Sequence, residues 1–74
     1  MVIDTSALMA VLLKEPGYEQ LLGAMIVAPD KRMSAFTWLE TAASWLHKTR
    51  NPDALPELRR LVNDLKIDII PFDR

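Results

Sequence analysis

The hydrophobic positions of this chain alternate between short apolar runs and longer stretches with helical spacing. The chain opens with Val2 and Ile3, two β-branched residues that lead directly into Asp4, and this order predicts a short buried strand. Apolar residues then recur at helical spacing over 7–12 and again over 18–26, and the second stretch follows the i, i+3, i+4, i+7, i+8 template throughout. The pattern therefore predicts one strand followed by two helices.

The middle of the chain predicts a second strand and a third helix. Residues 32–35 form a short segment bounded by a turn, which we interpret as a strand. Thr37 to Glu40 then form a capping-box pattern, in which Thr37 opens a helix and Glu40 reaches back to the Thr37 amide. We expect this third helix to run to about Lys48.

The third helix is apolar around most of its circumference. It has two neighbouring apolar stripes, Leu39, Ala43 and Leu46 and, beside them, Trp38, Ala42 and Trp45. Its polar stripe consists of Glu40, Thr41, Ser44, His47 and Lys48. A helix with so wide an apolar surface must be covered on two sides.

The last part of the chain predicts a fourth helix and a third strand. Residues 51–53 form a turn, and Pro56 suits the first turn of a helix. The final segment, 67–72, is rich in β-branched and apolar residues, which is typical of a strand. The core-facing residues of the fourth helix are expected to be Leu58, Leu61, Val62 and Leu65.

This order of elements predicts an α/β fold of the form β-α-α-β-α-α-β. Helices separate the strands, so right-handed crossovers and a parallel sheet are expected. A parallel sheet needs helices on both faces, and the four helices could supply that cover, although the third would keep apolar surface to spare. We therefore expect residues 1–74 to be the N-terminal portion of a single, larger α/β domain.

Composition narrows the possible functions. The chain has 74 residues, which allows one domain, and it contains no cysteine, which excludes disulfides and thiolate metal sites. Its net charge of −1 gives no overall attraction to nucleic acid, so any such contact requires a local patch. No apolar run approaches the ~20 residues of a membrane span, and the start lacks a signal-peptide pattern. We expect a soluble cytoplasmic protein.

Two acids are candidates for joint chemistry. Asp4 follows the first predicted strand and Glu40 follows the second, and parallel neighbouring strands would bring both to the sheet edge where ligands bind in such folds. Carboxylate ligands without cysteine favour Mg²⁺ or Mn²⁺, which could activate water and clamp a phosphate. The alternative is that both acids are helix caps, with Asp4 capping the first helix and Glu40 closing the capping box.

Other polar residues carry weaker signals. His47, the only histidine, lies seven residues after Glu40, or ~10 Å along a helix axis, so the two cannot share a metal ion and His47 is expected on the surface. Basic residues gather around the turn between the third and fourth helices, and they form either a phosphate-contacting edge or an ordinary solvated face. These are Lys48, Arg50, Arg59 and Arg60.

Three segments resemble those of PIN-domain proteins, especially the VapC-type toxins of bacterial toxin–antitoxin pairs. The hydrophobic pair followed by Asp-Thr-Ser-Ala at 4–7 resembles the opening of these proteins. Residues 33–42 resemble the second PIN motif, a strand-end serine followed by a helix that carries an acid. Residues 67–74 are similar to the segment after the fourth helix. The resemblance runs through the whole chain in the right order.

The resemblance implies a PIN-like three-layer fold and a Mg²⁺-dependent endoribonuclease toxin of a type II toxin–antitoxin system. Such a protein hydrolyses RNA phosphodiester bonds and is held inactive by a cognate antitoxin protein. Asp4 would be the first catalytic metal ligand, Glu40 the second, and Ser6 the small hydroxyl residue beside them. PIN domains carry further acids in a C-terminal half, whose positions are not matched by Asp64, Asp68 or Asp73.

We therefore expect this chain to be a poor ribonuclease alone and to associate, as a homodimer or with a complementing C-terminal fragment. Two interpretations from other classes remain. The first is a non-catalytic, self-associating α/β module whose acids are caps. The second is a phospho-acceptor α/β domain, which is less favoured because no acidic pair precedes Asp4.

Overall fold

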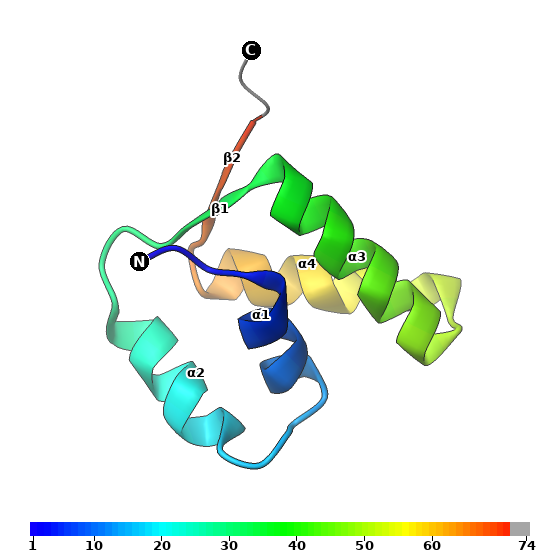
Figure 1. The fold of residues 1–74 in the computed structure, drawn as a ribbon, viewed down its shortest axis with the longest axis horizontal. Coiled ribbons are helices and arrows are strands. Elements are labelled where there is room, and N and C mark those ends of the chain that lie inside the picture. The colour runs from blue at the N-terminus through cyan, green and yellow to red at the C-terminus, as the bar shows by residue number, and fades with distance from the viewer. Residues whose placement is uncertain (72–74) are drawn as a thin grey trace.

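Helices and short strands follow one another in the order that the hydrophobic pattern predicts. A computed structural model of the protein describes residues 1–71, and the predicted strand residue Phe72 lies outside this range. The elements, shown in Figure 1, are α1 (Thr5–Leu12), α2 (Tyr18–Val27), β1 (Arg32–Ser34), α3 (Ala35–Thr49), a 3₁₀ turn (Pro52–Ala54), α4 (Leu55–Asp64) and β2 (Asp68–Ile70).

The sheet is parallel, as predicted. β1 and β2 pair with Arg32 opposite Asp68, Met33 opposite Ile69, and Ser34 opposite Ile70. The two strands are connected through α3 and α4, and this helical crossover is what parallel neighbours require.

The first predicted strand is present only as a single parallel bridge between Val2 and Arg32. The Ile3 N–H donates to the Arg32 carbonyl over 2.7 Å, and the Arg32 N–H donates to the Met1 carbonyl over 2.9 Å. The segment is this short because α1 begins at Thr5, immediately after these bonds. β1 is therefore the middle strand, with the N-terminal segment on one side and β2 on the other.

The start of α3 corrects the capping-box prediction. Ser34 is the N-cap residue, and its side-chain oxygen accepts a hydrogen bond from the Thr37 N–H over 3.0 Å. The helix thus begins at Ala35 rather than Thr37, because the serine at the strand end caps it earlier. Glu40 lies inside the helix, so the prediction that it closes a capping box at Thr37 is wrong.

One hydrophobic core joins all four helices to the inner side of the sheet. Leu58 of α4 is fully buried, Val62 and Leu65 are nearly so, and Leu61 packs against them partly buried, which confirms the core-facing stripe predicted for this helix. The complete buried cluster is Ile3, Leu8, Met9, Val11, Met25, Met33, Trp45, Ala54, Leu58, Val62, Leu65 and Ile67.

The two faces of the sheet are covered unequally. Ile3 and Met33 point into the core, whereas Val2 on the other face is 77% exposed and Ile70 is 46% exposed. That outer face is hollowed by a groove of about 300 Å³, which Arg32 helps to line. The α/β class and parallel sheet are confirmed, and within residues 1–71 the helices cover only the inner face.

α3 also has more apolar surface than the described residues cover. The Trp38, Ala42 and Trp45 stripe packs on the core, while Phe36 and Leu39 on the opposite side are 58% and 54% exposed. This confirms the predicted surplus.

Thr41 and Trp45 of α3 make contacts that the stripe pattern does not predict. Thr41 was predicted on the polar stripe, but it is fully buried because it faces α1 rather than solvent. Trp45 donates from Nε1 to the Ala54 carbonyl over 3.0 Å, which ties the end of α3 to the 3₁₀ turn.

No helix within residues 1–71 combines the length and apolar character needed to cross a membrane.

Two matched leucine substitutions test the difference between covered and uncovered apolar surface. Leu58→Ala is expected to lower the free energy of unfolding by about 2–5 kcal/mol, because it opens a cavity in the core. Leu39→Ala is expected to change it by less than about 0.5 kcal/mol, because its side chain is exposed. Urea unfolding followed by Trp fluorescence measures both, and equal losses for the two variants would contradict the core described above.

Candidate functional site

Asp4 occupies the point where the N-terminal segment ends and α1 begins. Its backbone is extended, and its Oδ1 accepts hydrogen bonds from the Ala7 N–H over 2.9 Å and from the Ser6 hydroxyl over 3.0 Å. The capping role predicted for Asp4 is therefore confirmed. Both bonds fall on Oδ1, and among the described residues no hydrogen bond reaches Oδ2, so capping leaves one carboxylate oxygen for other contacts.

Asp4 and the start of α3 lie at the same edge of the sheet. Val2 is opposite Arg32 in a parallel bridge, so Asp4 and Ser34, each two residues further on, both lie at the carboxyl-end edge of the sheet. Each ends a strand segment and caps the helix that follows. The N-termini of α1 and α3, with their unpaired backbone N–H groups and positive dipole ends, therefore point to one edge.

Glu40 lies further along α3. It is the sixth residue of the helix, which places it ~7.5 Å along the axis from Ala35 at 1.5 Å per residue. Its side chain is exposed. In the part of the chain that the structure describes, it forms neither a side-chain hydrogen bond nor an ion pair, so its carboxylate is not committed to a structural contact there.

A hydrogen-bonded pair of threonines, of which Thr41 is fully buried and Thr5 half-buried, connects the two acid-bearing segments. The hydroxyl oxygens of Thr5 and Thr41 are 3.1 Å apart and share a hydrogen bond. Thr5 follows Asp4 and Thr41 follows Glu40, so the bond joins α1 and α3, which lie side by side, next to both acids. Sequence reasoning missed this pair because the helical wheel put Thr41 on the polar face. The repeated acid–threonine order, Asp4-Thr5 and Glu40-Thr41, was the available signal.

The donor set suits a hard cation. The carboxylates of Asp4 and Glu40 and the hydroxyl of Ser6 are all oxygen donors, and cysteine is absent from the chain. Among residues 1–71 no group of three or more His, Cys, Asp or Glu side chains comes together. Two carboxylates fit an ion such as Mg²⁺ that keeps several of its waters, and they do not form a complete protein cage.

The remaining candidates lie elsewhere. His47 is exposed in the last part of α3, as predicted. Arg59 extends from α4 with its Cζ 5.4 Å from the centroid of the Trp38 ring, a cation–π distance. Arg60 lines a cleft on another side of α4. Arg59 and Arg60 thus lie against different parts of the surface and do not form one basic edge. This favours the interpretation of the basic residues as a solvated face.

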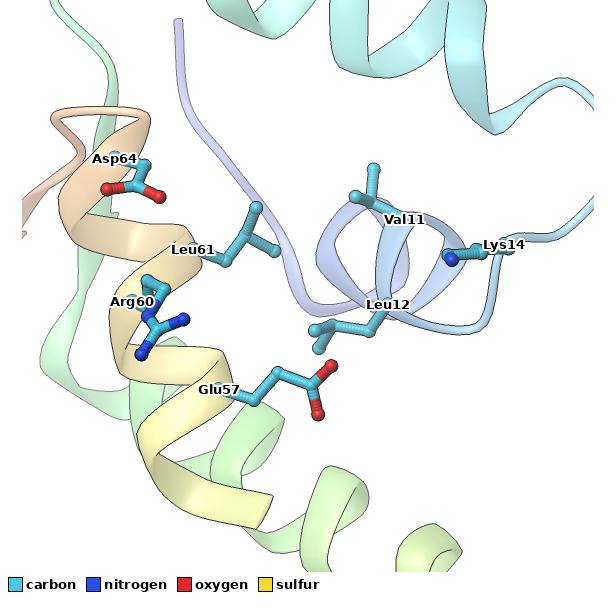
Figure 2. Close-up of a pocket in the computed structure, with 7 residues that line it drawn as sticks. All are labelled: Val11, Leu12, Lys14, Glu57, Arg60, Leu61 and Asp64. Atoms are coloured by element: carbon cyan, nitrogen blue, oxygen red, sulfur yellow. The ribbon is translucent and has the colours of Figure 1, made fainter.

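That cleft lies between the end of α1 and α4 and holds about 230 Å³ (Figure 2). Apolar side chains form its inner part and charged side chains of both signs surround them. Its lining residues are Val11, Leu12, Lys14, Glu57, Arg60, Leu61 and Asp64. The sequence analysis does not predict this cleft, because the cleft depends on the distance between α1 and α4, which no sequence pattern indicates.

Comparison with known proteins gives one consistent result. A sequence model of the PIN domain matches residues 1–74. The chain is 37% identical over 68 residues to Ribonuclease VapC42 of Mycobacterium tuberculosis, and equally to a VapC ribonuclease of Mycobacterium bovis. Those matches cover 92% of this chain and 48% of each relative.

A third relative matches over a shorter stretch. Ribonuclease VapC of Mycolicibacterium smegmatis is 55% identical over 42 residues, which is 57% of this chain and 33% of that protein. The chain thus spans at most about half the length of these curated relatives.

Two substitutions of Asp4 separate its capping role from its charge. Asp4→Ala is expected to lower the free energy of unfolding by about 0.5–2 kcal/mol, because the Ala7 N–H loses its acceptor. Asp4→Asn keeps an acceptor oxygen and is expected to cost less than about 1 kcal/mol, mostly through the lost charge at the helix N-terminus. Thermal or urea unfolding in EDTA measures both. Equal losses would mean that the charge, and not the cap, stabilises α1.

Proposed function

Because the chain belongs to the PIN-domain family, we propose that it is the N-terminal portion of a VapC-type endoribonuclease toxin, which hydrolyses RNA phosphodiester bonds with the help of Mg²⁺ or Mn²⁺. The observation that carries this proposal is the convergence of Asp4 and the acid-bearing helix α3 on one edge of a parallel sheet. The names of the related ribonucleases support the reaction class.

Asp4 and Glu40 are the proposed catalytic metal ligands. Asp4 would contribute Oδ2, since its Oδ1 is bonded to Ala7 and Ser6, and Glu40 would contribute its exposed carboxylate. A bound divalent cation supplies a water activated for attack and neutralises charge on the phosphodiester. Ser6 donates from its hydroxyl to the Asp4 carboxylate and holds it in place, and the N-termini of α1 and α3 at this edge of the sheet favour a phosphate there.

The proposed partners follow from the same assignment. The substrate is RNA, the regulator is a cognate antitoxin protein, and the setting is the cytoplasm. The exposed face of the sheet around Val2 and Ile70, and the exposed side of α3 around Phe36 and Leu39, support association with a second copy or with a complementing C-terminal fragment.

A non-catalytic, self-associating α/β module is the second candidate. The exposure of Phe36 and Leu39 favours it, as does the use of Asp4 as a helix cap. In this case Asp4 and Glu40 would not bind a common metal ion. The two candidate functions therefore predict different effects of substituting these acids on the affinity for Mn²⁺.

Metal binding is the decisive measurement. We expect Mn²⁺ to bind the chain weakly, with a Kd on the order of millimolar, because two carboxylates leave most of the ion's coordination to water. Asp4→Asn and Glu40→Gln should each weaken binding about tenfold or more, since each removes one charged ligand. Mn²⁺ electron paramagnetic resonance titration measures the affinity, and Asp53→Asn, on the remote 3₁₀ turn, is the matched control.

If Asp4→Asn and Glu40→Gln bind Mn²⁺ as the unsubstituted chain does, the ribonuclease assignment fails and the association module is favoured. If the Asp53→Asn control weakens binding equally, Mn²⁺ is responding to overall charge and not to a site.

Activity gives an independent test. The 74-residue chain alone is expected to cleave RNA slowly or not at all, because the acids at the proposed site fix too little of the metal geometry. Labelled RNA incubated with the chain in Mg²⁺ or Mn²⁺ and resolved on a denaturing gel checks this. Specific cleavage that disappears with Asp4→Asn would overturn the expectation of low activity while supporting the assigned residues.

A further inference from the structure

We propose that Thr41 is a positioning residue, which acts through Thr5 to hold Asp4 and Glu40 at a fixed separation. The inference rests on the proposed function, because it assumes that the two acids share a divalent cation. It extends that function to a partly buried polar contact that would touch neither the metal nor the RNA.

The geometry of the contact is well defined. Thr41 is 0% exposed, and its Oγ1 lies 2.8 Å from the Thr37 carbonyl oxygen and 3.1 Å from the Thr5 Oγ1. A hydroxyl carries one proton and can accept two hydrogen bonds. Both contacts are satisfied when Thr41 donates to the carbonyl within α3 and Thr5 donates to Thr41, so the Thr41 oxygen has a fixed direction toward α1.

The Thr5–Thr41 hydrogen bond lies where it would restrict the distance between the Asp4 and Glu40 carboxylates. The Asp4 carboxylate is fixed to α1 by its bonds to Ala7 and Ser6, and Glu40 is part of α3. Among the described residues, the Thr5–Thr41 bond is the only side-chain hydrogen bond that joins α1 to α3. A shift of one helix along the other would therefore break this bond and change the distance between the two carboxylates together.

An apolar contact would not set the spacing in the same way. A pair of valines has the size and shape of the threonine pair, but packing alone tolerates small sliding motions that a hydrogen bond of defined length and direction resists. Breaking the bond would leave the half-buried Thr5 hydroxyl without its partner on α3, which carries a cost, while Thr41 would keep its bond to the Thr37 carbonyl. The pair thus links the position of α3 to that of Asp4.

The test compares Thr41→Val, which removes the hydroxyl at nearly constant shape, with Thr41→Ser, which keeps it. We expect Thr41→Val to weaken Mn²⁺ binding about three- to tenfold, the range that the net contribution of one hydrogen bond corresponds to. Thr41→Ser should stay within about twofold of the unsubstituted chain, because the donor and acceptor remain. The full 74-residue chain is used throughout, and Mn²⁺ alone is the probe.

Thr49→Val provides the matched control for a merely structural effect. Thr49 is another threonine of α3, and its hydroxyl donates to the Trp45 carbonyl over 2.9 Å at the far end of the helix. Thr49→Val removes one hydroxyl from α3, as Thr41→Val does. It should leave the Mn²⁺ affinity within about twofold of the unsubstituted chain, because Asp4 and Glu40 are remote from Thr49. Thermal unfolding in EDTA establishes that each variant is folded at the titration temperature.

A double-substitution cycle distinguishes positioning from general loosening. If Thr41 acts by placing Glu40, then in the Glu40→Gln background Thr41→Val should have little further effect on Mn²⁺ affinity. Thr5→Val removes the other half of the bond and gives a second, independent variant, which serves if Thr41→Val does not fold. It is expected to weaken Mn²⁺ binding to a similar extent.

The outcomes separate this inference from the proposed function. If Asp4→Asn and Glu40→Gln weaken Mn²⁺ binding while Thr41→Val and Thr5→Val do not, the positioning role is overturned and the metal site stands. If neither acid matters, the proposed function fails and the inference fails with it. If Thr49→Val weakens binding as strongly as Thr41→Val, the effect is a general loosening of α3, and the positioning role is again overturned.

Discussion

The parallel pairing of the first residues with β1 is the constraint on which the rest of the structure depends. Two backbone hydrogen bonds at Arg32 bind the N-terminal segment to the middle strand, and they fix where each strand ends. Because each strand end carries a capping side chain, Asp4 on one and Ser34 on the other, two helices begin at the same edge of the sheet. The pairing therefore sets the edge at which Asp4 lies, whereas Glu40 is placed by the packing of α3 against α1.

Apolar surface is buried on one side of the sheet and of α3 and exposed on the other. The inner face of the sheet and the tryptophan stripe of α3 share one core, while the outer face around Val2 and the far side of α3 around Leu39 remain open. A PIN-domain chain that spans at most about half the length of its relatives thus combines a closed core with apolar surface that the described residues leave exposed.

The site illustrates how far a sequence pattern reaches. Asp4 and Glu40 are candidates for the site because each acid follows a strand, and the residue type of Asp4 indicates the capping function that the structure shows. The capping box at Thr37 was the wrong assignment, because Ser34 competes for the same amide and lies closer to the strand end. Thr41 was misplaced for a related reason: a helical wheel ranks residues by polarity, and a threonine whose hydroxyl is satisfied by Thr37 and Thr5 can be buried.

The sequence by itself determined the order of the elements, the α/β class and the core stripe of α4, and it proposed the two acids, because each depends on the spacing of residues near one another in the chain. Only the tertiary structure decided that the first strand shrinks to one bridge, that one face of the sheet stays open, and that Thr5 meets Thr41. These features depend on contacts between residues more than twenty positions apart, such as Val2 with Arg32. Local periodicity carries no record of which distant surfaces meet or how closely they pack.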